Sequence, residues 1–365
     1  MSLKCGIIGI TNTGKSTLFN CISETRAATS NFAFSTNKSN LGQVKVPDER
    51  LYLIDKLIHS ARIVHTTVDI TDIPGLTKGS SRGEGVGNSF LADIRNCDAL
   101  IHVVRCFDDP NLPHIETTVD PVRDRETIDL ELQVKDLESI EKRITKFEKA
   151  AKTGERSVIK GLEACLKIRA QLENFRNVRD LALTSEEGGH VADLCLLTAK
   201  PVIYVCNVDE KSAVSGNHYS ARFKESVSGE KAEVLIIAAK AEAEIAELES
   251  PEDRLAFLSE IGLEEPGVNK LIRSAFSILN LEVFFTAGPK EVRAWTIRKG
   301  STAPVAAGVI HSDLERGFIR AEVMKYSDFI FLGSEAACRD AGKLLIEGKN
   351  YIVKDGDILH IRFNV

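Results

Sequence analysis

The sequence predicts an α/β protein built on a doubly wound, mainly parallel sheet, with an inserted antiparallel helical hairpin and a smaller α+β module. Three observations predict it: a phosphate-binding loop between an apolar strand and a helix near the N-terminus, a long stretch of helical spacing inside the strand–helix alternation, and short strands with glycine turns near the C-terminus. We therefore expect a nucleotide-binding domain over 1–123 and 198–280, the helical insertion over 124–197, and the α+β module over 281–365.

The composition narrows the class of protein. The chain has 365 residues, is 43% hydrophobic and carries a net charge of −6, so any binding to nucleic acid must come from a local patch. Its eight cysteines are scattered without a C-x-x-C pair, which is typical of core residues in a reducing compartment. No apolar run approaches a membrane span and no signal peptide is evident, so we expect a soluble, cytoplasmic protein without a membrane partner.

The phosphate-binding loop covers residues 9–16, which read Gly-Ile-Thr-Asn-Thr-Gly-Lys-Ser. Such a loop directs backbone N–H groups and a helix N-terminus at a triphosphate, and the flanking strand and helix argue against a chance glycine-rich turn. Lys15 is expected to reach the β- and γ-phosphates, and Ser16 to bind Mg²⁺. Further contacts with the nucleotide are expected from Asn12, Thr13, Gly14 and Thr17.

Two later segments are expected to complete the magnesium and γ-phosphate site. Asp72-Ile73-Pro74-Gly75 follows a predicted strand, so Asp72 would bind Mg²⁺ through water and the N–H of Gly75 would contact the γ-phosphate. Thr36 lies in a polar stretch after the first helix and is expected to add its hydroxyl to the magnesium site. The alternative for Thr36 is an ordinary surface loop.

The residue that would orient the attacking water is not in its usual place. Many GTPases have Gln directly after the D-x-x-G glycine, but this chain has Leu76, which cannot hydrogen-bond to water. A glycine-rich run over 78–87 follows and suggests a second switch. The group that orients water must therefore come from elsewhere. His114 lies in a loop after the next strand, where its side chain could be mobile.

The segment Asn207-Val208-Asp209-Glu210 follows a predicted strand at the place where guanine-specific proteins carry N-K-x-D. We expect Asn207, Val208 and Glu210 to contact the base. Glutamate is one methylene longer than aspartate, so it fits the guanine edge poorly, and the loss of that hydrogen-bond pair favours ATP. A shifted register that uses Asp209 would restore a carboxylate, so a GTPase is the alternative.

The insertion has the spacing of a coiled coil. Leu137, Ile140, Ile144 and Phe147 follow one another at intervals of three, four and three residues. Residues 141–180 contain eleven Lys or Arg against six Asp or Glu, an excess of five positive charges. This charge is either a solvated helical face or a basic arm that contacts RNA.

With these motifs the chain resembles the YchF / Obg-like ATPase family along nearly its whole length. The matching pieces are the phosphate loop, Asp72–Leu76 with its glycine-rich continuation, Asn207–Glu210, and the C-terminal runs Phe285–Trp295, Ala307–His311 and Asp355–Asp357. The resemblance implies a G domain, a coiled-coil insertion and a C-terminal TGS domain. It also implies ATP hydrolysis with Mg²⁺, stimulation by K⁺ bound at Asn12, and association with the ribosome. His114 matches a water-positioning histidine and, with Lys15 and Gly75, forms the expected catalytic set.

The chain departs from the family pattern in its first switch. Residues 31–40 lack two prolines that the family usually has, and Lys38 reverses a charge. These departures suggest a diverged paralogue. They also motivate a second hypothesis, a nucleotide-gated scaffold for RNA or the ribosome with little hydrolysis.

Overall fold

The computed structural model describes the chain in two compact units, which are considered separately. One contains Met1–Gln43 and Asp69–Leu271, and the other contains Val44–Val68 and Ile272–Val365. The sequence predicts residues 44–68 and 272–280 to belong to the nucleotide-binding domain, whereas the structure assigns both to the second unit. There the strand β3 (Ile63–Val64) pairs with β9 (Val292–Arg298). The structure describes residues 3–23, 39–75, 87–114, 116–152 and 155–364.

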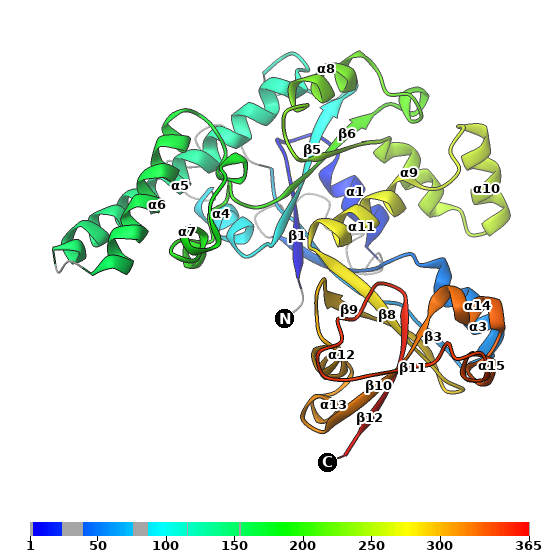
Figure 1. The fold of residues 1–365 in the computed structure, drawn as a ribbon. Helices are drawn as coiled ribbons and strands as arrows, with labels where there is room; N and C mark the ends of the chain where they lie inside the picture. Colours follow the sequence, from blue (N-terminus) through cyan, green and yellow to red (C-terminus); the bar gives the residue numbers. More distant parts are fainter. Residues whose placement is uncertain (1–2, 24–38, 76–86, 115, 153–154, 365) are drawn as a thin grey trace. The chain divides into compact units, whose positions relative to one another are not determined.

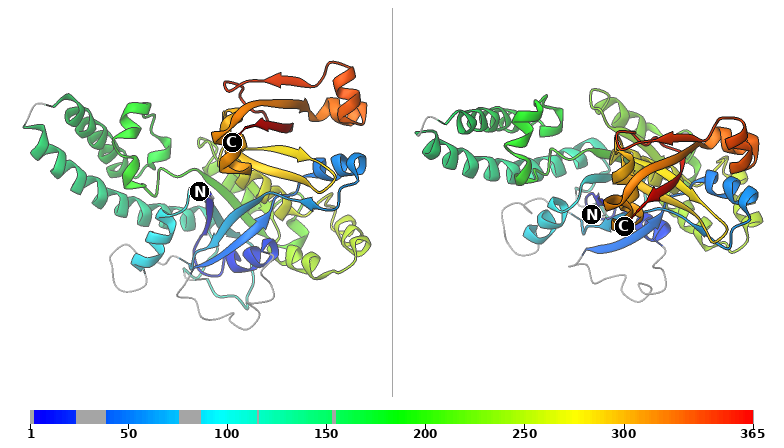
Figure 2. Two further views of the ribbon diagram at one scale, coloured as in Figure 1. Left: turned by 90° about the horizontal axis from the view of Figure 1, so that it is seen from below. Right: turned by 60° about the horizontal axis from the view of Figure 1, so that its bottom comes forward.

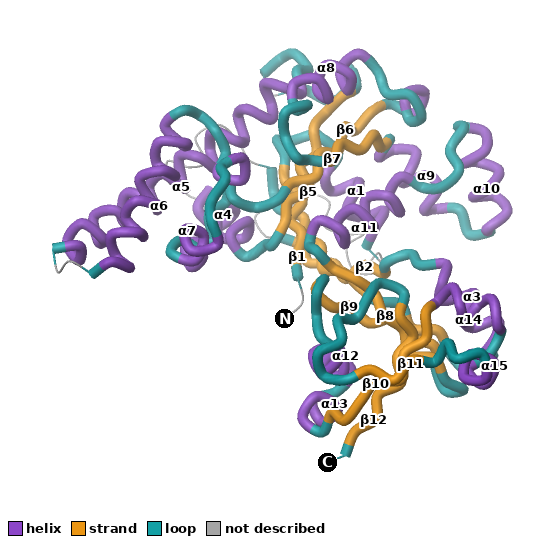
Figure 3. Tube along the Cα trace, viewed as in Figure 1, coloured by secondary structure: helices purple, strands orange, loops and turns teal. Residues whose placement is uncertain are grey.

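The first unit is built on a sheet of strand order β2-β4-β1-β5-β6-β7 (Figures 1 and 3). β1 pairs in parallel with β4 and β5, and β5, β6 and β7 pair in parallel in turn, which confirms the mainly parallel, doubly wound sheet. β5 and β6 are buried along their whole length, as expected for strands covered on both faces. The strands are β1 (Lys4–Ile8), β2 (Asn40–Lys45), β4 (Thr67–Asp72), β5 (Ala99–Cys106), β6 (Val202–Val208) and β7 (Glu233–Ile237).

Helices follow these strands. α1 begins directly after the phosphate loop and buries Leu18, Phe19 and Ile22, the apolar face that the sequence pattern predicts. The helices around this sheet are α1 (Lys15–Ile22), α4 (Gly87–Arg95), α8 (His218–Ser226), α9 (Ala239–Glu247), α10 (Pro251–Glu260) and α11 (Gly267–Ile278), which runs past the boundary of the unit.

The predicted helical insertion is confirmed. α5 (Pro121–Ala151) and α6 (Arg156–Glu173) lie side by side as an antiparallel hairpin (Figure 2). Ile140 and Ile144 share a buried cluster with Cys165, Ile168 and Leu172, as the three–four spacing requires. The hairpin is followed by η2 (Val178–Asp180), α7 (Ser185–Gly189) and η3 (Ala192–Leu194).

The base of the hairpin is fixed by a buried carboxylate. Asp136 on α5 is fully buried and accepts hydrogen bonds from the backbone N–H groups of Leu197 (2.8 Å) and Thr198 (2.7 Å) and from the Thr198 hydroxyl (2.7 Å). Because these residues lead into β6, this contact ties α5 to the parallel sheet.

The second unit is an α+β domain with strand order β11-β10-β12-β8-β9-β3. β8 and β9 are antiparallel, as are β10 and β12, whereas β12 and β8 pair in parallel. Its other elements are α3 (Glu49–Ile58), β8 (Leu281–Ala287), α12 (Ala303–Ile310), α13 (Ser312–Arg316), β10 (Phe318–Lys325), α14 (Tyr326–Leu332), α15 (Glu335–Asp340), β11 (Leu345–Glu347) and β12 (Asp357–Phe363). In the described parts of both units, every helix is too short or too polar to cross a bilayer.

Candidate nucleotide site

The phosphate loop joins β1 to α1 and is held by its own side chains. Thr13 is fully buried, and its hydroxyl donates a hydrogen bond to the Ile10 carbonyl at 3.2 Å. Gly14 has φ +92°, and a Cβ there would lie 2.3 Å from Nδ2 of Asn207. Only glycine combines this backbone angle with so close a neighbour, which explains the second glycine of the motif.

Two buried charged groups of opposite sign lie beside the phosphate loop, Lys15 at the start of α1 and Asp72 at the end of β4. Lys15 is 6% exposed, and its Nζ donates to the Ile10 carbonyl at 2.6 Å. Burial lowers the pKa of Lys15 to about 8, although nearby Asp72 acts in the opposite direction. Burial also raises the pKa of Asp72, although the Ser16 hydroxyl donates to its Oδ2 at 2.8 Å. In both groups burial away from water disfavours the charged form, and the opposite charge nearby offsets only part of this effect.

The arrangement fits a triphosphate with a divalent cation. Oδ1 of Asp72 is buried and has no hydrogen-bond partner among the described residues. With the Ser16 hydroxyl it offers the hard oxygen ligands that Mg²⁺ prefers, and the Lys15 ammonium suits phosphate. Gly75 closely approaches the loop, since a Cβ there would lie 3.0 Å from the Thr11 nitrogen and 3.2 Å from Lys15 Nζ.

The structure therefore brings Lys15, Ser16, Asp72 and Gly75 together at the carboxyl ends of β1 and β4, where the sequence analysis expected the phosphates. Thr17 is exposed on the first turn of α1. Thr36 and Leu76 lie outside the described residues.

In the segment expected to contact the base, the Asn207 side chain hydrogen-bonds to protein backbone on both sides. It is 4% exposed, its Nδ2 donates to the Thr13 carbonyl at 2.8 Å, and its Oδ1 accepts from the Ala239 N–H at 3.0 Å. The side chain therefore connects the phosphate loop to the start of α9. Val208 differs from the expectation, because it is 3% exposed and packs in the hydrophobic core instead of facing a ligand.

The two acidic residues after Val208 have different surroundings. Asp209 caps the short helix η4 (Glu210–Ser212), since its carboxylate accepts from the Ser212 N–H at 3.2 Å and from the Ser212 hydroxyl at 3.1 Å. Glu210 is exposed at the position that corresponds to the aspartate of N-K-x-D. Asp209, the alternative contact with the base, therefore already has its carboxylate in hydrogen bonds with Ser212.

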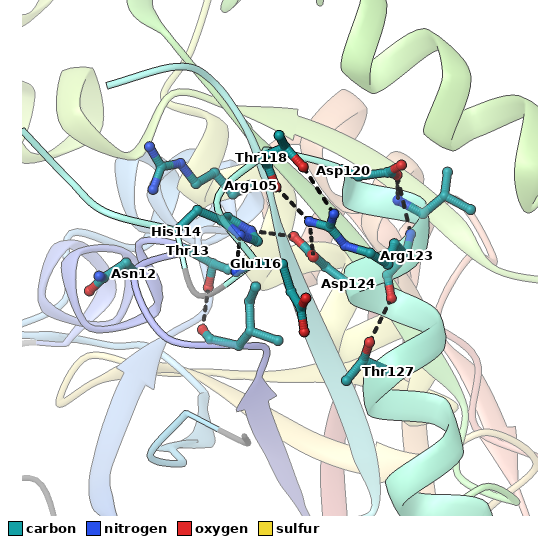
Figure 4. Close-up of polar contacts among 12 residues, drawn as sticks. Asn12, Thr13, Arg105, His114, Glu116, Thr118, Asp120, Arg123, Asp124 and Thr127 are labelled. Carbon is teal, nitrogen blue, oxygen red and sulfur yellow. Dashed lines mark hydrogen bonds and ion pairs between the residues drawn. The ribbon is translucent and has the colours of Figure 1, made fainter. Parts of the chain in front are cut away.

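His114 lies in the loop between β5 and α5, next to the phosphate loop (Figure 4). Nδ2 of Asn12 donates to the Pro113 carbonyl at 3.1 Å, so the two loops touch. The sequence analysis expected a movable side chain, but the His114 side chain is only 3% exposed. Its Nε2 lies 2.9 Å from Oδ2 of Asp124, and the Glu116 N–H donates to its Nδ1 at 3.1 Å.

The loop has a scaffold that sequence reasoning missed. Arg105, at the end of β5, is 2% exposed and donates to the backbone carbonyls of Phe107 (3.1 Å), Asp109 (3.3 Å) and Leu112 (2.9 Å). A buried arginine next to the end of a mainly apolar strand is unusual, and this feature of the sequence was the available signal. Asp124 carried no comparable signal, because acidic residues are common in the first turn of a helix.

Comparisons with known proteins agree with this architecture. The model of the family described as "50S ribosome-binding GTPase" matches residues 4–150. A model of the YchF GTPase C-terminal domain, described as "Protein of unknown function (DUF933)", matches residues 281–364.

Similar proteins extend over the entire chain. The "Ribosome-binding ATPase YchF" of Bacillus subtilis is 47% identical, and that of Escherichia coli O157:H7 is 45% identical, each with 100% of both chains covered. The solved structure of the Schizosaccharomyces pombe YchF GTPase matches this chain with a TM-score of 0.87 and 35% identity. The match covers 99% of this chain and 98% of that chain. Identity at this level over the full length of both chains shows that the protein belongs to the YchF family.

Proposed function

We propose that the protein is a Mg²⁺-dependent ATPase that works as a nucleotide switch on the ribosome. The observation that carries this proposal is the buried pair of Lys15 and Asp72, in which Oδ1 of Asp72 has no hydrogen-bond partner among the residues that the structure describes. Phosphate and a divalent cation supply the two counter-charges that the pair lacks. The relatives named ribosome-binding ATPases support the choice of reaction and of partner.

Each residue has a defined task in the proposed mechanism. Lys15 exchanges the Ile10 carbonyl for the β- and γ-phosphates, and Gly75 offers its N–H to the γ-phosphate. Ser16, Asp72 and Thr36 would hold Mg²⁺, which when bound neutralises charge on the phosphate oxygens. Asn12 would hold K⁺ beside them, and His114 would turn toward the γ-phosphate and orient water.

The proposed preference for ATP rests on the segment after β6. Asn207 is occupied in bracing the loop, Val208 is buried, and Asp209 caps a turn, so Glu210 is the acidic side chain left to face a base. Its extra methylene disfavours the bidentate contact that selects guanine. A GTPase is the alternative and predicts the opposite preference in competition binding.

The hairpin is the proposed contact with the ribosome. Three of its basic residues are already paired with acidic residues that follow it: Lys160 with Glu186, Lys167 with Glu187, and Arg143 with Asp193. These pairs reduce the positive charge available for RNA, so a contact with ribosomal RNA would use the other basic side chains of the hairpin. Salt-dependent co-sedimentation with ribosomal subunits in ATP and in ADP would test the contact.

The activity is tested by phosphate release from ATP with and without Mg²⁺. Lys15→Ala should lose ATP binding and turnover, because it removes the cation from the phosphate loop. Lys349→Ala is the matched control, since it removes an exposed lysine from the C-terminal unit. Equal turnover in both variants would contradict the proposal.

A further inference from the structure

We propose that Asp124 is a positioning residue that stores His114 away from the γ-phosphate, so that their contact must break before His114 can orient water. The inference rests on the proposed function, because it assumes that His114 serves ATP hydrolysis. It assigns to the first turn of α5 a task that goes beyond holding the hairpin.

The first observation is that both ring nitrogens of His114 already take part in hydrogen bonds within the protein. Nδ1 accepts from the Glu116 N–H, so the ring proton lies on Nε2 and is donated to Asp124 Oδ2 at 2.9 Å. The two side chains are 3% and 4% exposed. In this arrangement the ring can neither donate to nor accept from a water molecule at the phosphates.

The second observation is that Asp124 is itself held in place. Asp120 caps α5 through the N–H groups of Val122 and Arg123, and a carboxylate in the first turn suits the positive end of the helix. Arg123 lies 3.3 Å from Oδ1 of Asp124 and also donates to the Thr118 hydroxyl at 3.1 Å (Figure 4). The acceptor for His114 is therefore fixed by groups that do not depend on the histidine.

The third observation is that the loop backbone is anchored independently of the ring. Arg105 holds three carbonyls of the loop, and Asn12 holds the Pro113 carbonyl against the phosphate loop. Because the backbone already touches the phosphate loop, a change in the His114 rotamer can bring the ring to the nucleotide. Two contacts oppose this change, the hydrogen bond to Asp124 and the weaker one from the Glu116 N–H, and of these the one to the buried carboxylate is the stronger.

The test compares turnover in four proteins: the full-length wild type, Asp124→Ala, His114→Ala and the double variant. A hydrogen bond to a buried carboxylate is strong enough that its loss should raise basal ATP turnover about tenfold or more. The rise should vanish in the His114→Ala background. Glu126→Gln is the matched control, because it removes an exposed carboxylate two residues further along the same helix.

A second measurement does not depend on turnover. The nitrogen chemical shifts of the His114 ring should show a fixed Nε2–H tautomer in the wild type and an exchanging ring in Asp124→Ala. Asp124→Asn, which keeps an acceptor oxygen, serves if the alanine variant does not fold, and should show a smaller effect in both measurements.

Three results would overturn the proposal. Lower turnover in a folded Asp124 variant would mean that Asp124 orients His114 during the reaction. A rise that persists without His114 would mean that Asp124 acts through another group. A mobile His114 ring in the wild type would mean that no stored position exists. Failure of the proposed function looks different: the wild type would release no phosphate from ATP in the presence of Mg²⁺, whatever the ring shifts report.

Discussion

Replacing Asn207 with alanine tests whether one side chain keeps the phosphate loop in its binding shape. Asn207 is 4% exposed and bridges the Thr13 carbonyl and the Ala239 N–H, both of which belong to buried residues. Alanine leaves both backbone groups without a partner. A buried unpaired group costs about 1–3 kcal/mol, so the pair costs roughly 2–6 kcal/mol.

We expect this cost to appear in two quantities. The free energy of unfolding should fall by at least about 2 kcal/mol, and the affinity for ATP should fall by more than about tenfold, since about 1.4 kcal/mol corresponds to a factor of ten. Asn207→Asp should be similarly damaging, because it retains the acceptor for Ala239 but places a carboxylate oxygen against the Thr13 carbonyl.

The assay is urea unfolding together with fluorescent-ATP titration. Asn20→Ala is the matched control, because it makes the same chemical change at an exposed position of α1. The reasoning is refuted if Asn207→Ala keeps both the unfolding free energy and the ATP affinity of that control.

Three further predictions follow from buried charges. Asp72→Asn should abolish the gain in ATP affinity that Mg²⁺ gives, and ATP titrations with and without Mg²⁺ test this expectation. The melting temperature should be equal or higher, because burial disfavours the charged carboxylate of Asp72. Burial lowers the pKa of Lys15 to about 8, and the negative charge of a bound triphosphate should raise it again. The affinity for ATP should therefore fall as the pH rises above about 8, by up to about tenfold per pH unit. Calorimetry in two buffers of different ionisation enthalpy should show that a proton is taken up on binding. Asp136→Ala leaves the N–H groups of Leu197 and Thr198 unpaired and should lower the unfolding free energy by at least about 2 kcal/mol in urea titrations, and an unchanged value would disprove this account of the hairpin base.

Much of the fold could be predicted because its signals are local. The phosphate loop, the D-x-x-G segment and the three–four spacing of α5 each depend on residues close together in the chain. The two-residue strand Ile63–Val64 gave no such signal, since two apolar residues have no periodicity. The assignment of Val44–Val68 to the C-terminal unit therefore became evident only in the structure.

Two features of the site could not be predicted for a related reason. The role of Asn207 as a brace depends on Thr13, which lies 194 residues away in the sequence. The orientation of the His114 ring depends on how the first turn of α5 packs against the loop. In both cases the motif identified the residue, but the contact that defines its task is made by the tertiary structure.

The central claim is tested most directly by measuring the affinity and turnover of the purified protein for ATP and GTP, with Mg²⁺ and with either potassium or sodium. The account predicts tighter binding and faster hydrolysis of ATP, with turnover raised by potassium. Tighter binding and faster hydrolysis of GTP would contradict the assignment of Glu210, and binding of ATP without turnover in any condition would show a nucleotide-gated scaffold instead of an ATPase.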